Sequence, residues 1–333
     1  MGQAAESRAS GSLFGLAYGD ALGAPAEFRS IVEIEQMYGA GGPSDLVGDP
    51  ARVTDDTQMA LAVGWALHTV AITPDDLAEA LTQRFVAWLI SPDNNRAPGN
   101  TCLSACGALR EGRGWVQASL VGSKGCGANM RVTPVGLVPG LDLETVAGVA
   151  QLQSALTHGH PTALAASELT AVATRWLREG MALPDVPAAL RQRCADQRGV
   201  YREQWLGQLW RRSHDADAVT FIARGWDECA VAMDRLVDAV RHPDAAVDPC
   251  LVTGAGWIAE EALATAVYCA VLFADDPLAA LRRAATTSGD SDSIACLAGA
   301  FHGAAHGMAA WPQAWLERIE YADQLAALGA AWD

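Results

Sequence analysis

The 333-residue sequence lacks a long apolar segment and a recognisable targeting signal. Its longest apolar run, residues 262–274, has acidic residues on both sides and is shorter than the roughly 20 residues of a membrane-spanning helix. The first ten residues lack the basic start and apolar stretch of a secretory signal, and Glu6 stands where a myristoylation signal requires Ser or Thr. We therefore expect a cytoplasmic protein with no membrane partner, in which residues 262–274 form a core helix.

The eight cysteines lack the paired spacing of metal-binding and disulfide motifs. No two of them are separated by two residues, and several lie in apolar stretches with helical periodicity. They are Cys102, Cys106, Cys126, Cys194, Cys229, Cys250, Cys269 and Cys296. This usage indicates reduced thiols in a reducing compartment.

Positive charge is scarce, with 23 Lys and Arg residues against 39 Asp and Glu, and the net charge of −16 is distributed along the chain. Such a balance repels nucleic-acid backbones, so we expect no nucleic-acid partner. The chain also lacks a Ser/Pro/Gly-rich linker, a charge block and a low-complexity tract. Because half of the residues are hydrophobic and only 19% are charged, one large core is possible, and we expect a monomer with a single domain over residues 1–333.

Alternation typical of strands is almost absent, whereas apolar residues recur at helical spacing, as in Met59, Val63 and Leu67. Helix starts are indicated by proline after residues 73, 160, 183 and 276, because proline fits the first turn of a helix, where its missing N–H has no partner to lose. The sequence therefore predicts an all-α protein, a compact orthogonal bundle of a dozen or more helices.

Two acidic clusters stand near opposite ends of the chain, and each precedes an expected helix. Residues 54–57 read TDDT before a helix expected near Gln58, and residues 289–293 read GDSDS before one expected near Ile294. One interpretation is helix capping, since Asp, Ser and Thr accept the free N–H groups of a first turn. The other is binding of hard divalent cations, which prefer carboxylate and hydroxyl oxygens. A cap uses one side chain per helix, so the doubled acids favour metal, although nothing local proves that the clusters meet.

With both clusters in view, the chain resembles the ADP-ribosylglycohydrolase family over about residues 11–308. A start of the form Gly-Asp-Ala-x-Gly-x-Pro-x-Glu, a Thr-Asp-Asp-Thr box and a late Gly-Asp-x-Asp-Thr/Ser box are the family's pattern. Single strings of this kind are weak evidence, whereas several in the right order are strong evidence. The matching segments are residues 19–27 (GDALGAPAE), 54–57, 96–101 (RAPGNT), 125–131 (GCGANMR), 157–161 (THGHP) and 289–293.

The resemblance implies an all-helical fold with two divalent ions, Mg²⁺ or Mn²⁺. The metal ligands that carry over are Thr54, Asp55, Asp56, Asp290, Asp292 and Ser293. Two positions depart from the family's pattern. Ser293 replaces a common Thr but keeps an oxygen ligand, whereas Cys126 replaces a common Asn in the middle loop and weakens the transfer of substrate contacts.

The implied reaction is hydrolysis of the bond between ADP-ribose and a modified acceptor. Such a reaction passes through an oxocarbenium-like state, so it needs a positioned water, a base and an acid. The candidate catalytic residues are Glu27, Asp55, Asp56 and Asp292. The candidate substrate-binding residues are Gly99, Asn100, Gly125, Cys126, Gly127 and His158. Each of these also has a plain structural interpretation, as a turn glycine or a helix cap.

The substrate expected from the resemblance is an ADP-ribosylated protein, with arginine as the acceptor, or a small-molecule ADP-ribose conjugate. The alternatives are other linkages, to serine, an O-acyl group or a nucleobase, and a non-catalytic ADP-ribose-binding relative. All six metal positions keep an oxygen ligand, which favours catalysis. Phosphoester hydrolysis at paired aspartates is a further class, but no histidine stands beside either cluster.

Overall fold

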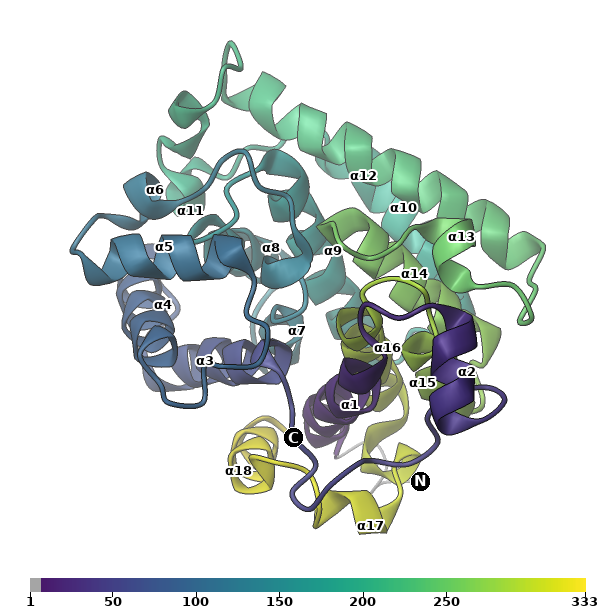
Figure 1. Cartoon of the computed structure of the whole chain (residues 1–333). Coiled ribbons are helices and arrows are strands. Elements are labelled where there is room, and N and C mark those ends of the chain that lie inside the picture. The colour runs from purple at the N-terminus through teal and green to yellow at the C-terminus, as the bar shows by residue number, and fades with distance from the viewer. Residues whose placement is uncertain (1–6) are drawn as a thin grey trace.

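The computed structural model describes residues 7–333, which form eighteen α-helices and five 3₁₀ helices (Figure 1). The all-α class and the number of helices expected from the sequence are confirmed. Pairing of strand type in this part of the chain is limited to isolated bridges, such as Gly125 with Ile258. Residues 1–6, which fall in the segment where the sequence predicts no targeting signal, lie outside the described residues.

Most helices follow one another through short connections, and the longest connection in the described chain, residues 39–54, joins α2 to α3. The first group is α1 (Arg8–Gly23), η1 (Ala24–Ala26), α2 (Ile31–Tyr38), α3 (Asp55–Thr69), α4 (Pro74–Leu89), α5 (Asn100–Arg110), α6 (Trp115–Ala118), η2 (Cys126–Ala128), α7 (Thr133–Leu137), α8 (Leu143–Ala155) and α9 (Pro161–Arg178). The second group is η3 (Leu183–Asp185), α10 (Val186–Gln197), α11 (Glu203–Leu206), η4 (Leu209–Arg212), α12 (Ala218–Arg241), α13 (Pro249–Thr253), α14 (Ala259–Leu272), α15 (Pro277–Ala285), α16 (Ser291–His306), η5 (Gly307–Ala310), α17 (Gln313–Leu316) and α18 (Ala322–Trp332).

Proline marks helix starts as the sequence predicts. Helices α4, α9 and α15 begin at Pro74, Pro161 and Pro277, and each is preceded by a side chain that accepts a first-turn N–H. At Pro184 the chain instead forms the short helix η3, and α10 begins only at Val186. In α4, α9 and α15, local capping chemistry therefore sets the start of the helix.

The helices that follow the two acidic clusters begin earlier than expected. Helix α3 begins at Asp55 instead of near Gln58, and α16 begins at Ser291 instead of near Ile294. In α3 the side chain of Thr54 caps the helix by accepting a hydrogen bond from the Asp56 N–H. The acidic residues therefore lie within the first turns, where free N–H groups and the helix dipole stabilise negative charge.

Helices α1 and α16 cross in direct backbone contact near the middle of the molecule (Figure 1). A Cβ atom on Gly19 would lie 2.0 Å from the carbonyl oxygen of Ala295, and one on Gly15 would lie 2.3 Å from that of Gly299. Only glycine permits this approach. The end of α1 is thereby fixed against the start of α16, where a Cβ on Gly23 would lie 2.6 Å from the Cα of Asp292.

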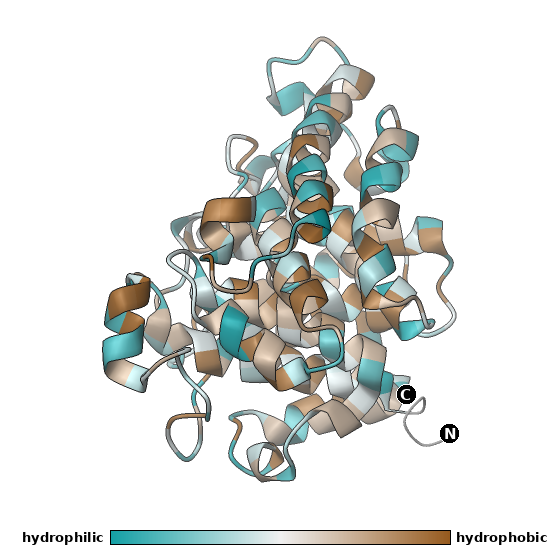
Figure 2. Cartoon of the chain, turned by 90° about the vertical axis from the view of Figure 1, so that its right-hand side faces the viewer, coloured by the Kyte–Doolittle hydropathy of each residue, from teal (hydrophilic) through white to brown (hydrophobic). Residues whose placement is uncertain are grey.

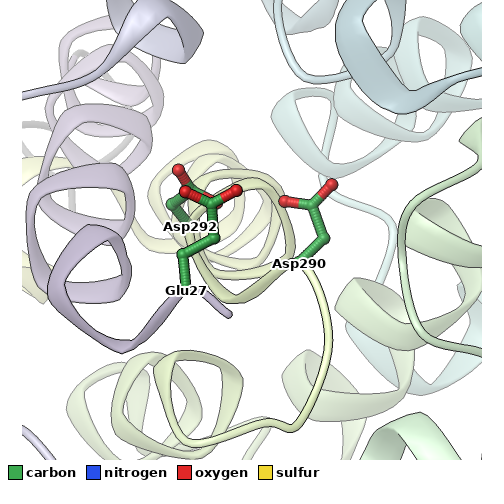
Figure 3. Close-up of side chains that lie close together, drawn as sticks. All are labelled: Glu27, Asp290 and Asp292. Atoms are coloured by element: carbon green, nitrogen blue, oxygen red, sulfur yellow. The ribbon is translucent and has the colours of Figure 1, made fainter. Parts of the chain in front are cut away.

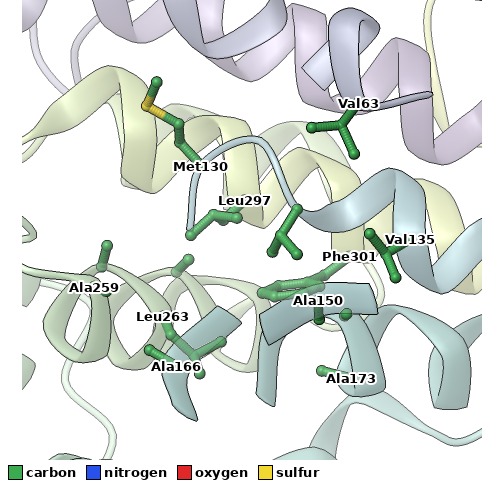
Figure 4. Close-up of a cluster of buried hydrophobic side chains, with 14 of the residues drawn as sticks. Val63, Met130, Val135, Ala150, Ala166, Ala173, Ala259, Leu263, Leu297 and Phe301 are labelled. Carbon is green, nitrogen blue, oxygen red and sulfur yellow. The ribbon is translucent and has the colours of Figure 1, made fainter. Parts of the chain in front are cut away.

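The hydrophobic core surrounds these two helices and draws on helices from the whole described chain. Figure 4 shows part of it, where Val63 of α3, Val135 of α7, Leu263 of α14 and Phe301 of α16 are fully buried. Burying side chains of this size stabilises the fold by about 1.5–3 kcal/mol each. Helix α14 includes most of the apolar run 262–274, which confirms the predicted core helix. Many outer helices combine hydrophilic and hydrophobic residues (Figure 2).

The structure also bears on the predictions about membrane spans and cysteines. Among residues 7–333, no helix combines the length and the apolar character needed to cross a bilayer. The eight cysteines are all free thiols, and all except Cys250 are buried. Burial raises the pKa of Cys102 to about 12, so that thiol is neutral at ordinary pH.

Candidate metal centre

Residues of the two acidic clusters line one cavity of about 300 Å³, together with Glu27 and residues 125–127, the glycine-rich turn. The contact between α1 and α16 explains this convergence, because it places the loop after α1 beside the first turn of α16. The predicted site residues that line the cavity are Glu27, Asp55, Asp56, Gly99, Asn100, Gly125, Cys126, Gly127, His158, Asp290, Asp292 and Ser293. Thr54 is the one predicted site residue that is not in this lining.

Glu27, Asp290 and Asp292 form the tightest acidic group (Figure 3). One carboxylate oxygen from each lies within 4.8 Å of the others. Glu27 directly follows the 3₁₀ helix η1, and its side chain meets the two aspartates at the start of α16. The sequence pattern named Glu27 for proton transfer only, so its place beside two proposed metal ligands makes it a further oxygen donor for a cation.

The carboxylates in the cavity repel one another and have lost much of their hydration. Burial first, and repulsion from Asp292 second, raise the pKa of Glu27 and of Asp55 to about 8. Burial also raises the pKa of Asp56, Asp290 and Asp292. Such a cluster is unfavourable unless protons or cations neutralise it.

The donor set fits divalent metal. Asp56 has a buried carboxylate oxygen, Oδ2, with no hydrogen-bond partner among residues 7–333, and an orphaned buried anion of this kind is costly. Carboxylate and hydroxyl oxygens are the ligands that Mg²⁺ and Mn²⁺ prefer. Thr54 lies behind this set, since its Oγ1 accepts from the Asp56 N–H at 3.3 Å. The acidic group can therefore hold a metal ion, and Thr54 contributes at least by shaping the start of α3.

Asp20 organises the start of α3 and was not a candidate in the sequence analysis. Its carboxylate is fully buried and accepts from the Thr54 N–H at 3.0 Å, from the Thr57 N–H at 3.1 Å and from the Thr57 hydroxyl at 2.5 Å. Burial, and then Asp292, raise the pKa of Asp20 to about 7. The only signal for it was its place in the matched segment 19–27, which gives no direction for the side chain.

The glycine-rich turn is fixed against the segment before α14. Cys126 donates its N–H to the carbonyl of Trp257 at 3.1 Å, and Ala259 donates to the carbonyl of Lys124 at 2.9 Å. The side chain of Asn129 donates to the Ala259 carbonyl at 3.1 Å. The turn is thus a rigid wall of the cavity. Burial raises the pKa of the Cys126 thiol well above its ordinary value, so that group is a neutral wall element.

An aromatic pair lies at the mouth of the cavity and was also missed by sequence reasoning. The rings of Phe28 and Trp257 stack with centroids 5.3 Å apart and an interplanar angle of 13°. Phe28 is 72% exposed and Trp257 41% exposed, although both line the cavity. Phe28 has a positive φ of 62°, which turns the chain sharply after Glu27.

Fold and site together define an all-α protein with an acidic, metal-competent pocket next to a glycine-rich turn. The pattern of the family described as ADP-ribosylglycohydrolase matches residues 1–332. The chain belongs to the ADP-ribosylglycohydrolase family, and it is an enzyme of that type.

Curated relatives agree with this assignment. The chain is 28% identical to the ADP-ribosyl-[dinitrogen reductase] glycohydrolase of Rhodospirillum rubrum, over 96% of this chain and 92% of that protein. It is 27% identical to the ADP-ribosylarginine hydrolase Tri1 of Pseudomonas putida, over 96% of this chain and 76% of that protein. A shorter match, 36% identical, covers 48% of this chain and about half, 52%, of an uncharacterized protein of Archaeoglobus fulgidus.

A solved structure shares the fold. An ADP-ribosylglycohydrolase-related protein complex superposes with a TM-score of 0.64 at 24% identity, covering 99% of this chain and 98% of the other. At that identity the likeness supports the helical architecture alone.

Proposed function

We propose that this chain is a metal-dependent hydrolase that removes ADP-ribose from modified arginine side chains of proteins. The observation that carries the proposal is the meeting of Glu27, Asp55, Asp56, Asp290 and Asp292 in one cavity. The arginine acceptor is supported by the similarity to the ADP-ribosylarginine hydrolase Tri1 of Pseudomonas putida. We further propose that residues 1–333 act as a single domain and that ADP-ribosylated protein is the partner.

Two divalent ions, Mg²⁺ or Mn²⁺, are the proposed cofactors. Their proposed ligands are Asp55, Asp56, Asp290, Asp292 and Ser293, which line the cavity with Glu27 adjacent, and Thr54, which follows from the family pattern and lies outside the lining. When bound, the ions would supply Lewis acidity for the hydrolysis. Oδ2 of Asp56 supports this assignment, because it has no hydrogen-bond partner among residues 7–333 and a bound cation would be its partner.

The side chains of the cavity have separate proposed tasks in the reaction. Water adds to the anomeric carbon, the bond from that carbon to the guanidine nitrogen breaks, and a proton reaches the departing nitrogen. Glu27 and Asp292 are the proposed proton-transfer groups, because they lie together at the cavity wall. Asp55 and Asp56, at the start of α3, act first as ligands.

The glycine-rich side of the cavity is the proposed site for the diphosphate. Gly125, Cys126 and Gly127 form a wall without bulky or charged side chains, and His158 lies against it. Gly99 and Asn100, at the start of α5, line the same cavity. Short backbone segments of this kind bring N–H groups close to an anionic ligand.

The proposal is tested with a panel of ADP-ribosylated arginine, serine and nucleotide substrates, with and without a chelator. We expect release of ADP-ribose from the arginine substrate, and loss of at least about 100-fold in rate with the chelator or with Asp56→Ala. Asp75→Ala is the matched control, since Asp75 is an exposed acidic residue in the first turn of α4. Activity that survives both the chelator and Asp56→Ala refutes the metal mechanism, whereas cleavage of another substrate alone replaces the acceptor.

A further inference from the structure

His158 lies beneath the glycine-rich turn with one edge of its ring towards the cavity. The residue is only 2% exposed, although it lines the cavity. A Cβ on Gly127 would lie 3.1 Å from the ring Cε1 and 3.4 Å from Nε2, and one on Gly125 would lie 3.5 Å from Nε2. Nε2 therefore faces the turn, and among residues 7–333 no protein atom accepts a hydrogen bond from it.

Arg131 lies behind His158, fully buried and without a carboxylate partner among residues 7–333. Its Nε donates to the Gln153 side chain at 2.9 Å, and its Nη2 donates to the Gln153 carbonyl and to Thr157 Oγ1, both at 2.8 Å. The guanidinium also lies 4.3 Å from the centroid of the Phe85 ring. A guanidinium has donors only, so the Thr157 oxygen must accept in this contact.

The single hydrogen of the Thr157 hydroxyl then has two neighbouring acceptors to choose between. The Ser154 carbonyl is 3.5 Å away and already accepts from the N–H groups of Thr157, at 3.0 Å, and His158, at 2.8 Å. Nδ1 of His158 is 2.8 Å away. A carbonyl with both lone pairs engaged and at this distance is a poor third acceptor. The hydroxyl therefore donates to Nδ1, and the hydrogen of a neutral ring is on Nε2.

We propose that Arg131 and Thr157 are positioning residues that hold His158 as the neutral Nε2–H tautomer, which donates to an oxygen of the ligand bound under the turn. If the ligand is ADP-ribose, which rests on the proposed function, that oxygen belongs to the diphosphate. His158 is then a permanent hydrogen-bond donor. It is excluded from acting as a base or as a metal ligand through Nε2.

The ring of His158 and the two groups of the network beside it, Arg131 and Cys102, each keep one charge state near neutral pH. Burial, reinforced by the positive charge of Arg131, lowers the pKa of His158 to about 3. The thiol of Cys102 lies 3.7 Å from Arg131 Nη1 and 3.8 Å from the Gly127 carbonyl, and burial raises its pKa to about 12. The same tautomer should therefore persist from about pH 5 to pH 8.

Nitrogen-15 NMR of histidine-labelled protein without ligand tests the tautomer, and His158→Gln assigns the signals. We expect a protonated Nε2 and an unprotonated Nδ1, unchanged between about pH 5 and pH 8. Thr157→Val removes the hydroxyl and should give a mixture of tautomers at the same ring, whereas Thr157→Ser should restore the wild-type signals. An Nδ1–H tautomer or a charged ring in the wild-type protein overturns the proposal, as does a Thr157→Ser variant that behaves like Thr157→Val.

Calorimetric titration with ADP-ribose tests the ligand contact. In His158→Gln the side-chain amide can place an N–H near the position of Nε2, whereas in His158→Asn it can place one near Nδ1. The two variants therefore differ mainly in where the donor lies. We expect His158→Asn to weaken binding by about 10- to 100-fold, the loss of one hydrogen bond to a charged group, and His158→Gln to retain most of the affinity. Equal losses in the two variants overturn the donor role. The expected nitrogen signals without any ADP-ribose binding support the tautomer and refute the proposed function.

Discussion

Asp20 offers the sharpest test of how the start of α3 is built. The substitution Asp20→Asn keeps the shape of the side chain but leaves one acceptor oxygen in place of two. In the protein Oδ2 accepts from the Thr54 N–H at 3.0 Å and from the Thr57 N–H and hydroxyl at 3.1 and 2.5 Å, and Oδ1 also accepts from the Thr54 N–H at 3.0 Å. With the amide oxygen in the Oδ2 place, the Thr54 N–H loses its bond to Oδ1 and faces the new NH₂ group, at a cost of about 1.5–3 kcal/mol for a lost bond to a charged acceptor.

The consequence should be larger for metal binding than for folding. Removing one negative charge relieves the repulsion between Asp20 and Asp292, which offsets part of the lost stability. The geometry of Asp55 and Asp56, however, depends on the bonds that Asp20 makes to the residues on either side of them. Loss of such a supporting contact typically weakens metal binding by about 10- to 100-fold, and we expect Asp20→Asn to raise the Kd for Mn²⁺ by that factor.

The measurement is calorimetric titration with MnCl₂, with urea denaturation of the same samples. The matched control is Asp142→Asn, because Asp142 is an exposed cap that accepts from the Thr145 N–H at 2.7 Å at the start of α8, away from the cavity. The control should lose stability slightly and bind Mn²⁺ as the wild type does. A folded Asp20→Asn protein with wild-type affinity for Mn²⁺ would show that the start of α3 does not depend on Asp20 for its metal geometry.

Three further predictions concern stability. The fully buried carboxylate of Glu168 is the common partner of Arg193, at 2.6 Å, and Arg202, at 2.8 Å. Glu168→Ala removes that partner and should lower the free energy of unfolding by about 3–5 kcal/mol in urea denaturation. A loss below about 1 kcal/mol contradicts this prediction. Burial lowers the pKa of His302 to about 3, and neither ring nitrogen has a hydrogen-bond partner among residues 7–333. The neutral ring therefore contributes to the free energy of unfolding above the unfolded pKa near 6.5, and this contribution is lost as the pH falls, because the unfolded state then binds a proton that the folded state does not. Between pH 7 and pH 5 this loss is about 2 kcal/mol, so the free energy of unfolding should fall by that much less in His302→Phe than in the wild type. Equal pH dependence of the unfolding free energy in the two proteins would refute the lowered pKa of His302. Mn²⁺ at about 100 times its Kd should raise the free energy of unfolding by about 2.7 kcal/mol over the chelated protein, a gain that Asp56→Ala should abolish.

The helical class and many boundaries are readable from local sequence because their causes are local. Spacing of apolar residues indicates helices, and a capping side chain followed by proline sets the starts of α4, α9 and α15. The starts of α3 and α16 were placed too late because acidic residues were assigned to loops before the helices. In the structure Asp55 and Asp292 belong to the first turns, which the free N–H groups there stabilise.

The composition of the acidic site was readable, whereas its assembly was not. Each cluster is visible as a string, but the contact that joins them runs through Gly15 and Gly19 of α1 against the backbone of α16. Glycines at intervals of four indicate a close helix contact without naming the partner helix. For the same reason Asp20 was overlooked, since its role depends on which helix start lies beside it. Phe28 was overlooked because a phenylalanine after a glutamate has no local signature of a cavity mouth.

The charge balance of the chain posed a problem that the structure resolves. An acidic protein proposed to bind a diphosphate needs donors, yet Lys124, which directly precedes the glycine-rich turn, is engaged by Glu228 at 2.7 Å and Glu260 at 2.6 Å. The positive charge of Arg131 is buried behind the wall instead, where it contacts the cavity-lining Cys102 and, through the Thr157 hydroxyl, the His158 ring. Donors of this kind are neutral and fixed. Under the proposed function, such donors would favour the diphosphate by their orientation, and they would not form ion pairs with the neighbouring carboxylates.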